Sequence, residues 1–190
     1  EKQEWKRKET IGEYLGVKRA VCKFMQFMMD EEVLNVEYDD QSDELVFITN
    51  SNALPVRYLS AGYQSLIWMI LDIAYRMALL NPDLLERINE TPGVILIDEL
   101  DMHLHPKWQW KVVEALKKTF PNVQFIAATH SPIIISSCEN VNIITVDEYK
   151  RIFYENSPYG MDVNYALDNC QDSRALPEDI QKLVDEFSEN

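Results

Sequence analysis

The sequence predicts an α/β domain whose sheet has parallel character and is flanked by helices. Two short apolar runs, Val94–Ile97 and Val123–Ala128, each end at polar residues, as strands buried on both faces of a parallel sheet do. Segments with helical periodicity alternate with these runs, which is the pattern of an α/β fold. With 190 residues, of which 46% are hydrophobic and 26% charged, the chain is long enough for one domain with its own core.

The first third of the chain predicts a helix followed by a hairpin. Residues 1–14 are polar and charged, and we interpret them as a tail or as the end of an inserted arm. From Val17 to about Glu32 apolar residues recur at intervals of three and four, which predicts an amphipathic helix. Val33–Tyr38 and Glu44–Thr49 then predict two strands, and the polar residues between them indicate a hairpin.

The middle of the chain predicts helices before and after the first apolar run. An apolar helix extends from about Tyr63 to Leu80, where Asn81-Pro82 ends it, and a short acidic helix and loop follow over residues 83–92. After the strand at Val94–Ile97, Pro106 suits the first turn of a helix that continues to about Thr119.

The last third predicts further strands and a helical end. A short helix follows Pro132, and two strands are expected at Val141–Val146 and Arg151–Tyr154. Residues 155–190 predict a helical C-terminal extension with helices near Met161–Asn169 and Pro177–Phe187. No composition shift marks an internal boundary, so we expect residues 1–190 to form a single domain.

Charge and cysteine content restrict the classes of function. The net charge is −14, and nucleic-acid binding needs clustered Lys and Arg, so any DNA contact is expected in the complete protein or a partner. No apolar stretch is long enough to span a membrane, and no signal peptide pattern opens the chain. The three cysteines lie far apart without metal-ligand spacing, which indicates reduced thiols in a cytoplasmic protein. They are Cys22, Cys138 and Cys170.

Two adjacent carboxylates, Asp98 and Glu99, directly follow the apolar run Val94–Ile97. Ligands of open α/β sheets bind at the carboxyl ends of the strands. In P-loop NTPases a carboxylate at such an edge supports Mg²⁺, and a nearby residue orients the attacking water. The pair therefore predicts a candidate catalytic edge, and the alternative interpretation is a strand followed by an ordinary charged turn.

Two further segments could meet a phosphate. His130, within Thr129–Pro132, follows the second apolar run and could donate to a phosphate oxygen or be an ordinary loop residue. Leu59–Gln64 opens the long apolar helix, and a helix N-terminus attracts anions. There Ser60 adds a hydroxyl, and Gly62 would let the backbone approach a ligand closely. The alternative interpretation is an N-cap serine with a tight-turn glycine.

Taken in order, these segments resemble the ABC ATPase superfamily, in particular its RecF/SMC-like branch and the related ATPases of bacterial anti-phage systems. The resemblance covers about residues 17–146, and its wording is closest to ATPases of Septu-type and retron-linked defence systems. It implies the C-terminal lobe of a P-loop NTPase, an ABC ATPase head. The matching segments are Leu59–Gln64 for the signature L-S-x-G-x-Q, Val94–Glu99 for Walker B, Leu100–Pro106 for the D-loop and Thr129–Pro132 for the H-loop.

The resemblance implies that ATP and Mg²⁺ are the cofactors. Asp98 would hold the Mg²⁺ shell, and Glu99 would polarise the attacking water. His130 would contact the γ-phosphate and report its presence.

The same resemblance implies a homodimer that encloses ATP. Ser60, Gly62 and Gln64 of one subunit would reach the γ-phosphate held by the opposite subunit. Asp101 would lie at the dimer seam. Hydrolysis would then depend on association, because donors that stabilise transition-state charge arrive from two chains.

The phosphate cradle of such an ATPase is missing from the sequence. A Walker A motif needs G-x-x-x-x-G-K followed by Ser or Thr, and none of the five glycines belongs to one. We expect Walker A on an N-terminal lobe that acts as a partner, and the chain, which begins with Glu1, to be a fragment or processed product that is inactive alone. The complete protein would act in DNA repair or anti-phage defence, with a nuclease or toxin as a further partner.

Two other classes of function stay open at this point. One is a non-enzymatic dimerisation module that keeps the fold without turnover. The other is a metal-dependent hydrolase or nuclease, in which acidic and histidine side chains on one segment bind a metal ion. Its ligands would come from Asp98, Glu99, Asp101, His103, His105 and His130.

Overall fold

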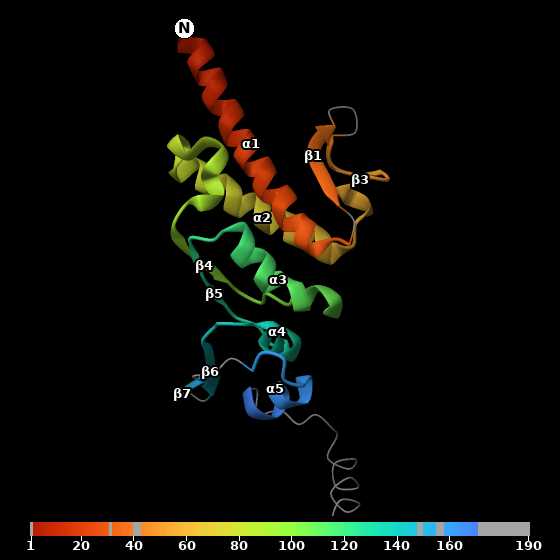
Figure 1. The fold of residues 1–190 in the computed structure, drawn as a ribbon, viewed down its shortest axis with the longest axis vertical. Coiled ribbons are helices and arrows are strands. Elements are labelled where there is room, and N and C mark those ends of the chain that lie inside the picture. Colours follow the sequence, from red (N-terminus) through yellow and green to blue (C-terminus); the bar gives the residue numbers. More distant parts are fainter. Residues whose placement is uncertain (1, 31, 40–42, 148–149, 155–157, 171–190) are drawn as a thin grey trace, which may run out of the picture. The chain divides into compact units, whose positions relative to one another are not determined.

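The chain is a mixed α/β protein that divides into two compact units, Glu1–Thr129 and His130–Asn190 (Figure 1). The computed structural model describes residues 2–30, 32–39, 43–147, 150–154 and 158–170. Within these ranges no helix is both long and apolar enough to cross a membrane. That residues 1–190 form one functional domain stays a prediction.

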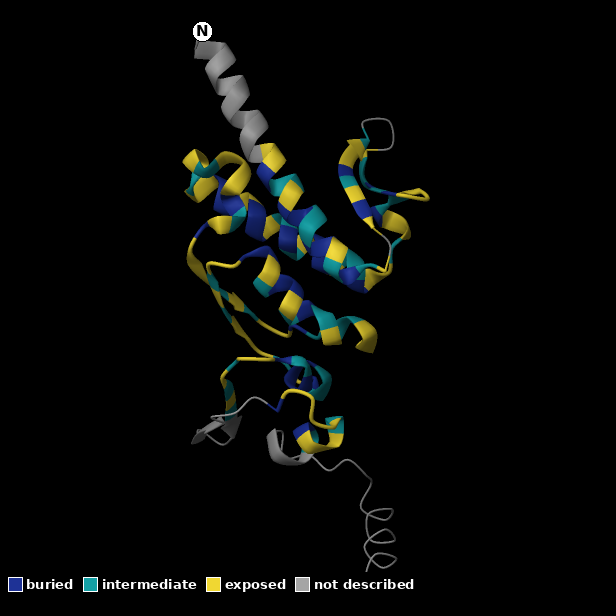
Figure 2. Cartoon of the chain, in the orientation of Figure 1, coloured by how far each residue is buried: buried dark blue, intermediate teal, exposed yellow. Residues whose placement is uncertain are grey.

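Helix α1 (Lys2–Met28) is the central packing element of the first unit. It contacts α2 (Ala61–Leu80), α3 (Pro106–Thr119), the 3-10 segment η2 (Pro82–Glu90) and strand β1 (Val33–Asp39). The predicted helix began only at Val17, because the residues before it carry no apolar stripe. Figure 2 shows α1 and α2 buried where they face each other. The buried apolar residues of α1 are Ala20, Val21, Phe24, Met25 and Met28, each at most 1% exposed.

Three antiparallel strands follow α1 in the order β1-β2-β3. The predicted hairpin is confirmed: β1 (Val33–Asp39) pairs with β2 (Glu44–Thr49), with Asp39 opposite Glu44. Strand β3 (Ala53–Pro55) was not predicted, because three residues are too few to show an alternation. The 3-10 turn η1 (Val56–Tyr58) then leads into α2.

Strands β4 (Gly93–Ile97) and β5 (Val123–Ala127) form a parallel pair in register, and α3 connects them. Both strands and the helix Pro106–Thr119 were predicted. The expected burial of β4 on both faces is wrong. Val94 is 58% exposed and Leu96 77%, while Ile95 and Ile97, which alternate with them, are half-buried.

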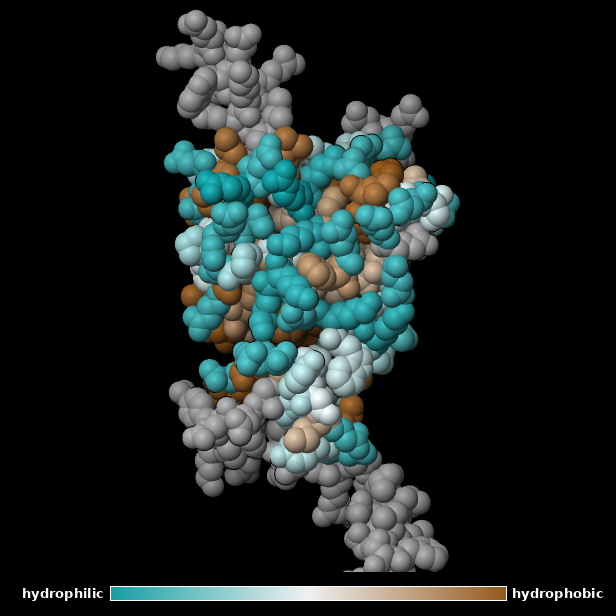
Figure 3. Space-filling model, viewed as in Figure 1, coloured by the Kyte–Doolittle hydropathy of each residue, from teal (hydrophilic) through white to brown (hydrophobic). Residues whose placement is uncertain are grey.

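One face of this two-stranded sheet is therefore apolar and open. Ile126 of β5 is 49% exposed on the same alternation, so three large apolar side chains from two strands reach the surface. Figure 3 shows apolar side chains at the margin of the view where β4 and β5 lie. Strand alternation places one set of residues inward and the other outward, and these three side chains belong to the outward set.

The second unit contains a helix pair and a strand pair. Helix α4 (Pro132–Ser137) packs against α5 (Val163–Cys170) through Ile135 and Ala166. Strands β6 (Ile143–Asp147) and β7 (Lys150–Tyr154) are antiparallel, as expected for two strands around a turn. The predicted helix at Pro177–Phe187 lies outside the described residues.

Gly16 provides a test of how closely α1 approaches η2. A Cβ atom at this position would lie 2.5 Å from the carbonyl oxygen of Leu85 and 2.9 Å from Cγ1 of Ile88. Helix propensity alone would make Gly16→Ala stabilising by about 0.8–1 kcal/mol. Overpacking against backbone costs about 1–3 kcal/mol, and a carbonyl in a packed turn cannot move aside as a flexible side chain can. We therefore expect a net loss of unfolding free energy in urea denaturation.

Gly93→Ala is the matched control for Gly16→Ala. A Cβ at Gly93 meets no atom within 4 Å. This variant is expected to change the unfolding free energy by less than about 0.5 kcal/mol. A Gly16→Ala chain that is more stable than wild type would contradict the close contact between α1 and η2.

Candidate functional site

The segment Leu59–Gln64 forms the N-terminal end of α2. Ser60 is the N-cap, and its Oγ accepts a long hydrogen bond of 3.5 Å from the Tyr63 amide. The side-chain amide of Gln64 donates to the carbonyl oxygen of Leu59 at 2.8 Å, so this side chain folds back onto the loop before the helix. The N-cap interpretation of Ser60 therefore holds, and it leaves the hydroxyl on an exposed residue.

Gly62 packs closely against another segment of the chain, and its expected role at a ligand stays a prediction. It lies inside the first turn of α2 and is buried, and it has no left-handed backbone. A Cβ there would lie 2.5 Å from the carbonyl oxygen of His103 and 3.2 Å from Cζ3 of Trp108. The tight-turn interpretation of Gly62 is thus wrong, and what its missing side chain permits is close contact with the Leu100–Pro106 segment.

Asp98 and Glu99 stand at the carboxyl end of β4, and both are exposed. The backbone of Glu99 is in the left-handed region, with φ of 51°. A non-glycine residue in this region costs free energy, roughly 1–2 kcal/mol, and such conformations gather at functional sites. The turn at Glu99 lets the Met102 amide donate to the Glu99 carbonyl at 2.9 Å.

The Leu100–Pro106 segment is tied to the end of the neighbouring strand. The Leu100 amide donates to the carbonyl of Ala128 at 3.0 Å, and the Ala128 amide donates to Ile97 at 2.9 Å. The Thr129 hydroxyl donates to the carboxylate of Asp101. These bonds join the chain after β4 to the chain after β5, so Asp101 lies at the carboxyl edge of the parallel pair.

The far end of the same segment caps α3. His105 is the N-cap, and its Nδ1 accepts from the Lys107 amide at 3.2 Å. The side chain of Gln109 donates to the carbonyl of Leu104 at 3.0 Å, and Leu104 itself is buried. The backbone of His103 is left-handed, with φ of 63°. His105 is thus used as a helix cap.

The described residues contain no group of three or more His, Cys, Asp or Glu side chains that could hold a metal ion. The alternative of a metal-dependent hydrolase built on His103 and His105 stays a prediction.

His130 is the first residue of the second unit and is exposed. The next residue, Ser131, caps α4, because its Oγ accepts from the Ile134 amide at 3.2 Å and Pro132 occupies the first helical turn. The expected loop followed by a short helix is therefore present. The proposed role of His130 at a phosphate stays a prediction.

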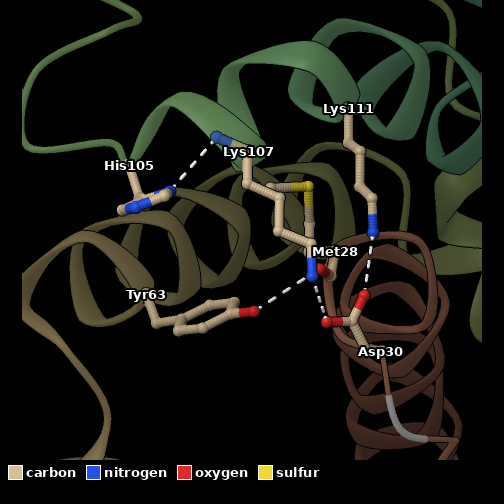
Figure 4. Close-up of polar contacts among 6 residues, drawn as sticks. All are labelled: Met28, Asp30, Tyr63, His105, Lys107 and Lys111. Carbon is tan, nitrogen blue, oxygen red and sulfur yellow. Dashed lines mark hydrogen bonds and ion pairs between the residues drawn. The ribbon is translucent and has the colours of Figure 1, made fainter.

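Sequence reasoning missed a cluster that links α1, α2 and α3, drawn in Figure 4. Lys107 and Lys111 of α3 contact the carboxylate of Asp30 at 2.5 and 3.3 Å. The Tyr63 hydroxyl donates to the Met28 carbonyl at 3.4 Å. The residues come from three separate segments, and no spacing in the sequence indicates their contact.

The charges in this cluster shift the acidity of two groups. Hydrogen bonds from Lys107 and then Lys111 hold the pKa of Asp30 below its ordinary value. Partial burial raises the pKa of the Tyr63 hydroxyl, and the negative charge of Asp30 adds to this rise. Both shifts favour the arrangement with an ionised Asp30 and a neutral Tyr63 that donates a hydrogen bond.

Two exposed carboxylates thus stand at the carboxyl edge of a parallel strand pair, where open α/β sheets bind their ligands. Residues 9–135 match the AAA ATPase domain family, and the chain belongs to that family. The expectation of a RecF/SMC-like ATPase is thereby confirmed at the level of the family.

Relatives with known names agree with this assignment. The chain is similar to the Retron Vc95 probable ATPase of Vibrio cholerae serotype O1 biovar El Tor, with 38% identity over 65% of this chain and 25% of the relative. The Retron Ec83 probable ATPase of Escherichia coli is 36% identical over 76% of this chain and 27% of its own length. Septu protein PtuA of Bacillus thuringiensis is 30% identical over 69% of this chain and 34% of its own length. The chain thus spans a quarter to a third of these relatives.

A solved structure shows the same fold. A chain from work on ATP-driven dimerization and DNA-stimulated activation of SMC ATPases superposes with a TM-score of 0.51. The match covers 99% of this chain and 98% of that chain, at 12% sequence identity. At this identity the likeness concerns the fold alone, which is a mixed α/β fold like that of an SMC ATPase head.

Proposed function

We propose that this chain is the part of an ABC-type ATPase head that supplies the hydrolytic edge and the signature loop. The observation that carries the proposal is the carboxyl end of β4, where Asp98 and Glu99 emerge exposed beside the parallel partner strand. Ligands of open α/β sheets bind at this edge. The signature segment Leu59–Gln64 packs on the loop that continues from the same edge.

The residues at the edge fit Mg²⁺ and ATP. Mg²⁺ prefers a small number of carboxylate oxygens together with water and phosphate oxygens, and Asp98 offers an exposed carboxylate at the strand end. Glu99 would orient and polarise the water that attacks the γ-phosphate. His130 would contact that phosphate. Bound Mg²⁺ would neutralise charge that develops on the phosphoryl oxygens.

The signature side serves a second subunit in this proposal. Ser60, with its exposed hydroxyl, and the amides of the first turn of α2 would face the γ-phosphate held by the other chain. Gln64, which bonds the Leu59 carbonyl, would hold the shape of the signature loop. Asp101, which accepts a hydrogen bond from Thr129, would lie at the dimer seam.

The open sheet face supports the existence of a partner lobe that carries Walker A. A parallel sheet with both faces covered is the usual state, and an isolated pair of strands is of marginal stability. Val94, Leu96 and Ile126 present an apolar face that further strands or helices would cover. We propose that the N-terminal lobe of the complete protein does so, with residues 1–190 as the C-terminal lobe.

The names of the relatives suggest the process. Retron-linked and Septu proteins point to anti-phage defence in place of DNA repair, with a nuclease or toxin as the effector that the ATP cycle controls. DNA contact would then belong to the complete protein, because a chain of net charge −14 offers few clustered cations.

A measurement of nucleotide affinity distinguishes the contributions of the two lobes. The 190-residue chain is expected to bind MgATP with a dissociation constant well above micromolar, whereas the complete protein binds in the micromolar range or tighter. The reason is that the amides and lysine of Walker A supply most contacts to the phosphates. Isothermal titration calorimetry with MgATP measures both. Micromolar binding by the 190-residue chain would reject the division of labour proposed here.

A further inference from the structure

The signature loop and the Leu100–Pro106 segment are joined by the side chain of Trp108. Its ring lies 3.8 Å from the ring of Tyr63, centroid to centroid, with the planes tilted by 46°. The same indole reaches the backbone of α2, since its Cζ3 atom would be 3.2 Å from a Cβ at Gly62. The indole ring also lies 5.9 Å from the His105 ring, centroid to centroid. The side chain of Trp108 thus lies against the first turn of α2 and close to His105 in the Leu100–Pro106 segment.

The contact leaves little freedom at the signature loop. The His103 carbonyl occupies the space that a side chain at Gly62 would need, so α2 and the Leu100–Pro106 segment touch through backbone. The indole of Trp108, from α3, packs beside this backbone contact. The first turn of α2, whose amides follow Ser60, therefore packs directly on Trp108.

The charged side chains around Asp30 contribute little to the stability of this contact. Lys107, the residue before Trp108, bonds Asp30, and Tyr63 donates to Met28 two residues earlier, as Figure 4 shows. The side chains of Asp30 and Lys107 are 67% and 55% exposed, and exposed ion pairs are screened by water and salt. The aromatic contact and the backbone contact at Gly62 are therefore the main determinants of loop position.

We propose that Trp108 is the positioning residue of the signature loop. It would fix the amides after Ser60 at the distance from Asp101 that ATP-driven dimerisation requires. This inference rests on the proposed function, and it concerns the signature side of the site alone. Misplacement of a catalytic contact by about 1 Å can cost a factor of about 100 in rate.

The test uses the complete protein with the Glu99→Gln background to hold ATP in place. Trp108→Ala is expected to weaken MgATP-driven dimerisation, measured by sedimentation, by about 10- to 100-fold. MgATP affinity of the dilute monomer, measured by calorimetry, should stay within about twofold, because the phosphate cradle lies on the other lobe. Trp108→Phe keeps a ring against Tyr63 and should restore most of the dimerisation.

Trp110→Ala is the matched control. Trp110 lies on the same helix two residues further, and it is 46% exposed. It should behave as the parent protein in both measurements. If Trp108→Ala does not fold, Trp108→Leu is compared with Trp110→Leu in the same way.

Three results would overturn the inference. Equal dimerisation of the Trp108 and Trp110 variants would show that Trp108 does not position the loop, while the proposed ATPase function would stand. Equal loss of monomer ATP affinity and dimerisation would assign Trp108 a general structural role. A Trp108→Phe variant as defective as Trp108→Ala would show that the aromatic contact is not what matters. Absence of MgATP-driven dimerisation in every variant, the parent included, would instead reject the proposed function.

Discussion

Glu99→Gln in the complete protein is expected to lower ATP turnover by about 10²- to 10⁴-fold, the usual contribution of a positioned general base. Glutamine keeps the size of the side chain and removes the basic carboxylate. ATP-bound dimers should accumulate, because nucleotide binds and is not consumed. Phosphate release under saturating MgATP gives the rate, and sedimentation with MgATP gives the dimer.

Glu114→Gln serves as the control for Glu99→Gln. Glu114 is an exposed glutamate of α3 whose carboxylate pairs with Lys118 at 3.2 Å, away from the carboxyl edge of the sheet. Its turnover should equal that of the wild type. Unchanged turnover in Glu99→Gln would reject Glu99 as the base. A wild-type protein that dimerises without any turnover would favour the non-enzymatic module.

Leu96→Lys is expected to be tolerated in the 190-residue chain and to destabilise the complete protein. In the 190-residue chain Leu96 is 77% exposed, and the variant should change the unfolding free energy by less than about 0.5 kcal/mol. In the complete protein we propose that this face of β4 is covered. An unpaired charge buried there would lower the unfolding free energy by about 3 kcal/mol or more. Urea denaturation of both proteins measures the difference.

Leu80→Lys is the matched control for this experiment. Leu80 is also 77% exposed, and it lies at the end of α2 instead of on the sheet. It should be tolerated in both proteins. Small and equal effects of Leu96→Lys and Leu80→Lys in the complete protein would contradict a lobe docked on Val94, Leu96 and Ile126.

Local patterns predicted the elements whose cause is local. The hairpin of β1 and β2 follows from strand residues around a polar turn, and α3 follows from Pro106 with an amphipathic run behind it. The first half of α1 was missed, because its polar residues carry no period that distinguishes a helix from a tail. Burial of β4 was overestimated, since a fully apolar run does not distinguish a strand buried on both faces from a strand with one exposed apolar face.

For the candidate site, the place of some residues in the fold could be predicted from the sequence, and their contacts could not. Asp98 and Glu99 could be placed at a strand end, because an apolar run that stops at two carboxylates is typical of the edge of a sheet. The partner of Gly62 could not be predicted, because His103 is far along the chain and the contact involves its backbone. Trp108 has ordinary helix spacing, so periodicity assigns it to packing and gives no indication that it contacts the segment Leu59–Gln64.

The left-handed backbone of Glu99 has a consequence for protein engineering. Asparagine and glycine adopt this conformation at lower cost than glutamate, so a screen for heat resistance would select them at this position. For the function proposed above, those same variants lack the carboxylate that activates water. Selection for thermal stability would therefore favour asparagine or glycine at residue 99, and selection for activity would favour glutamate. A library ranked by melting temperature would discard active proteins first.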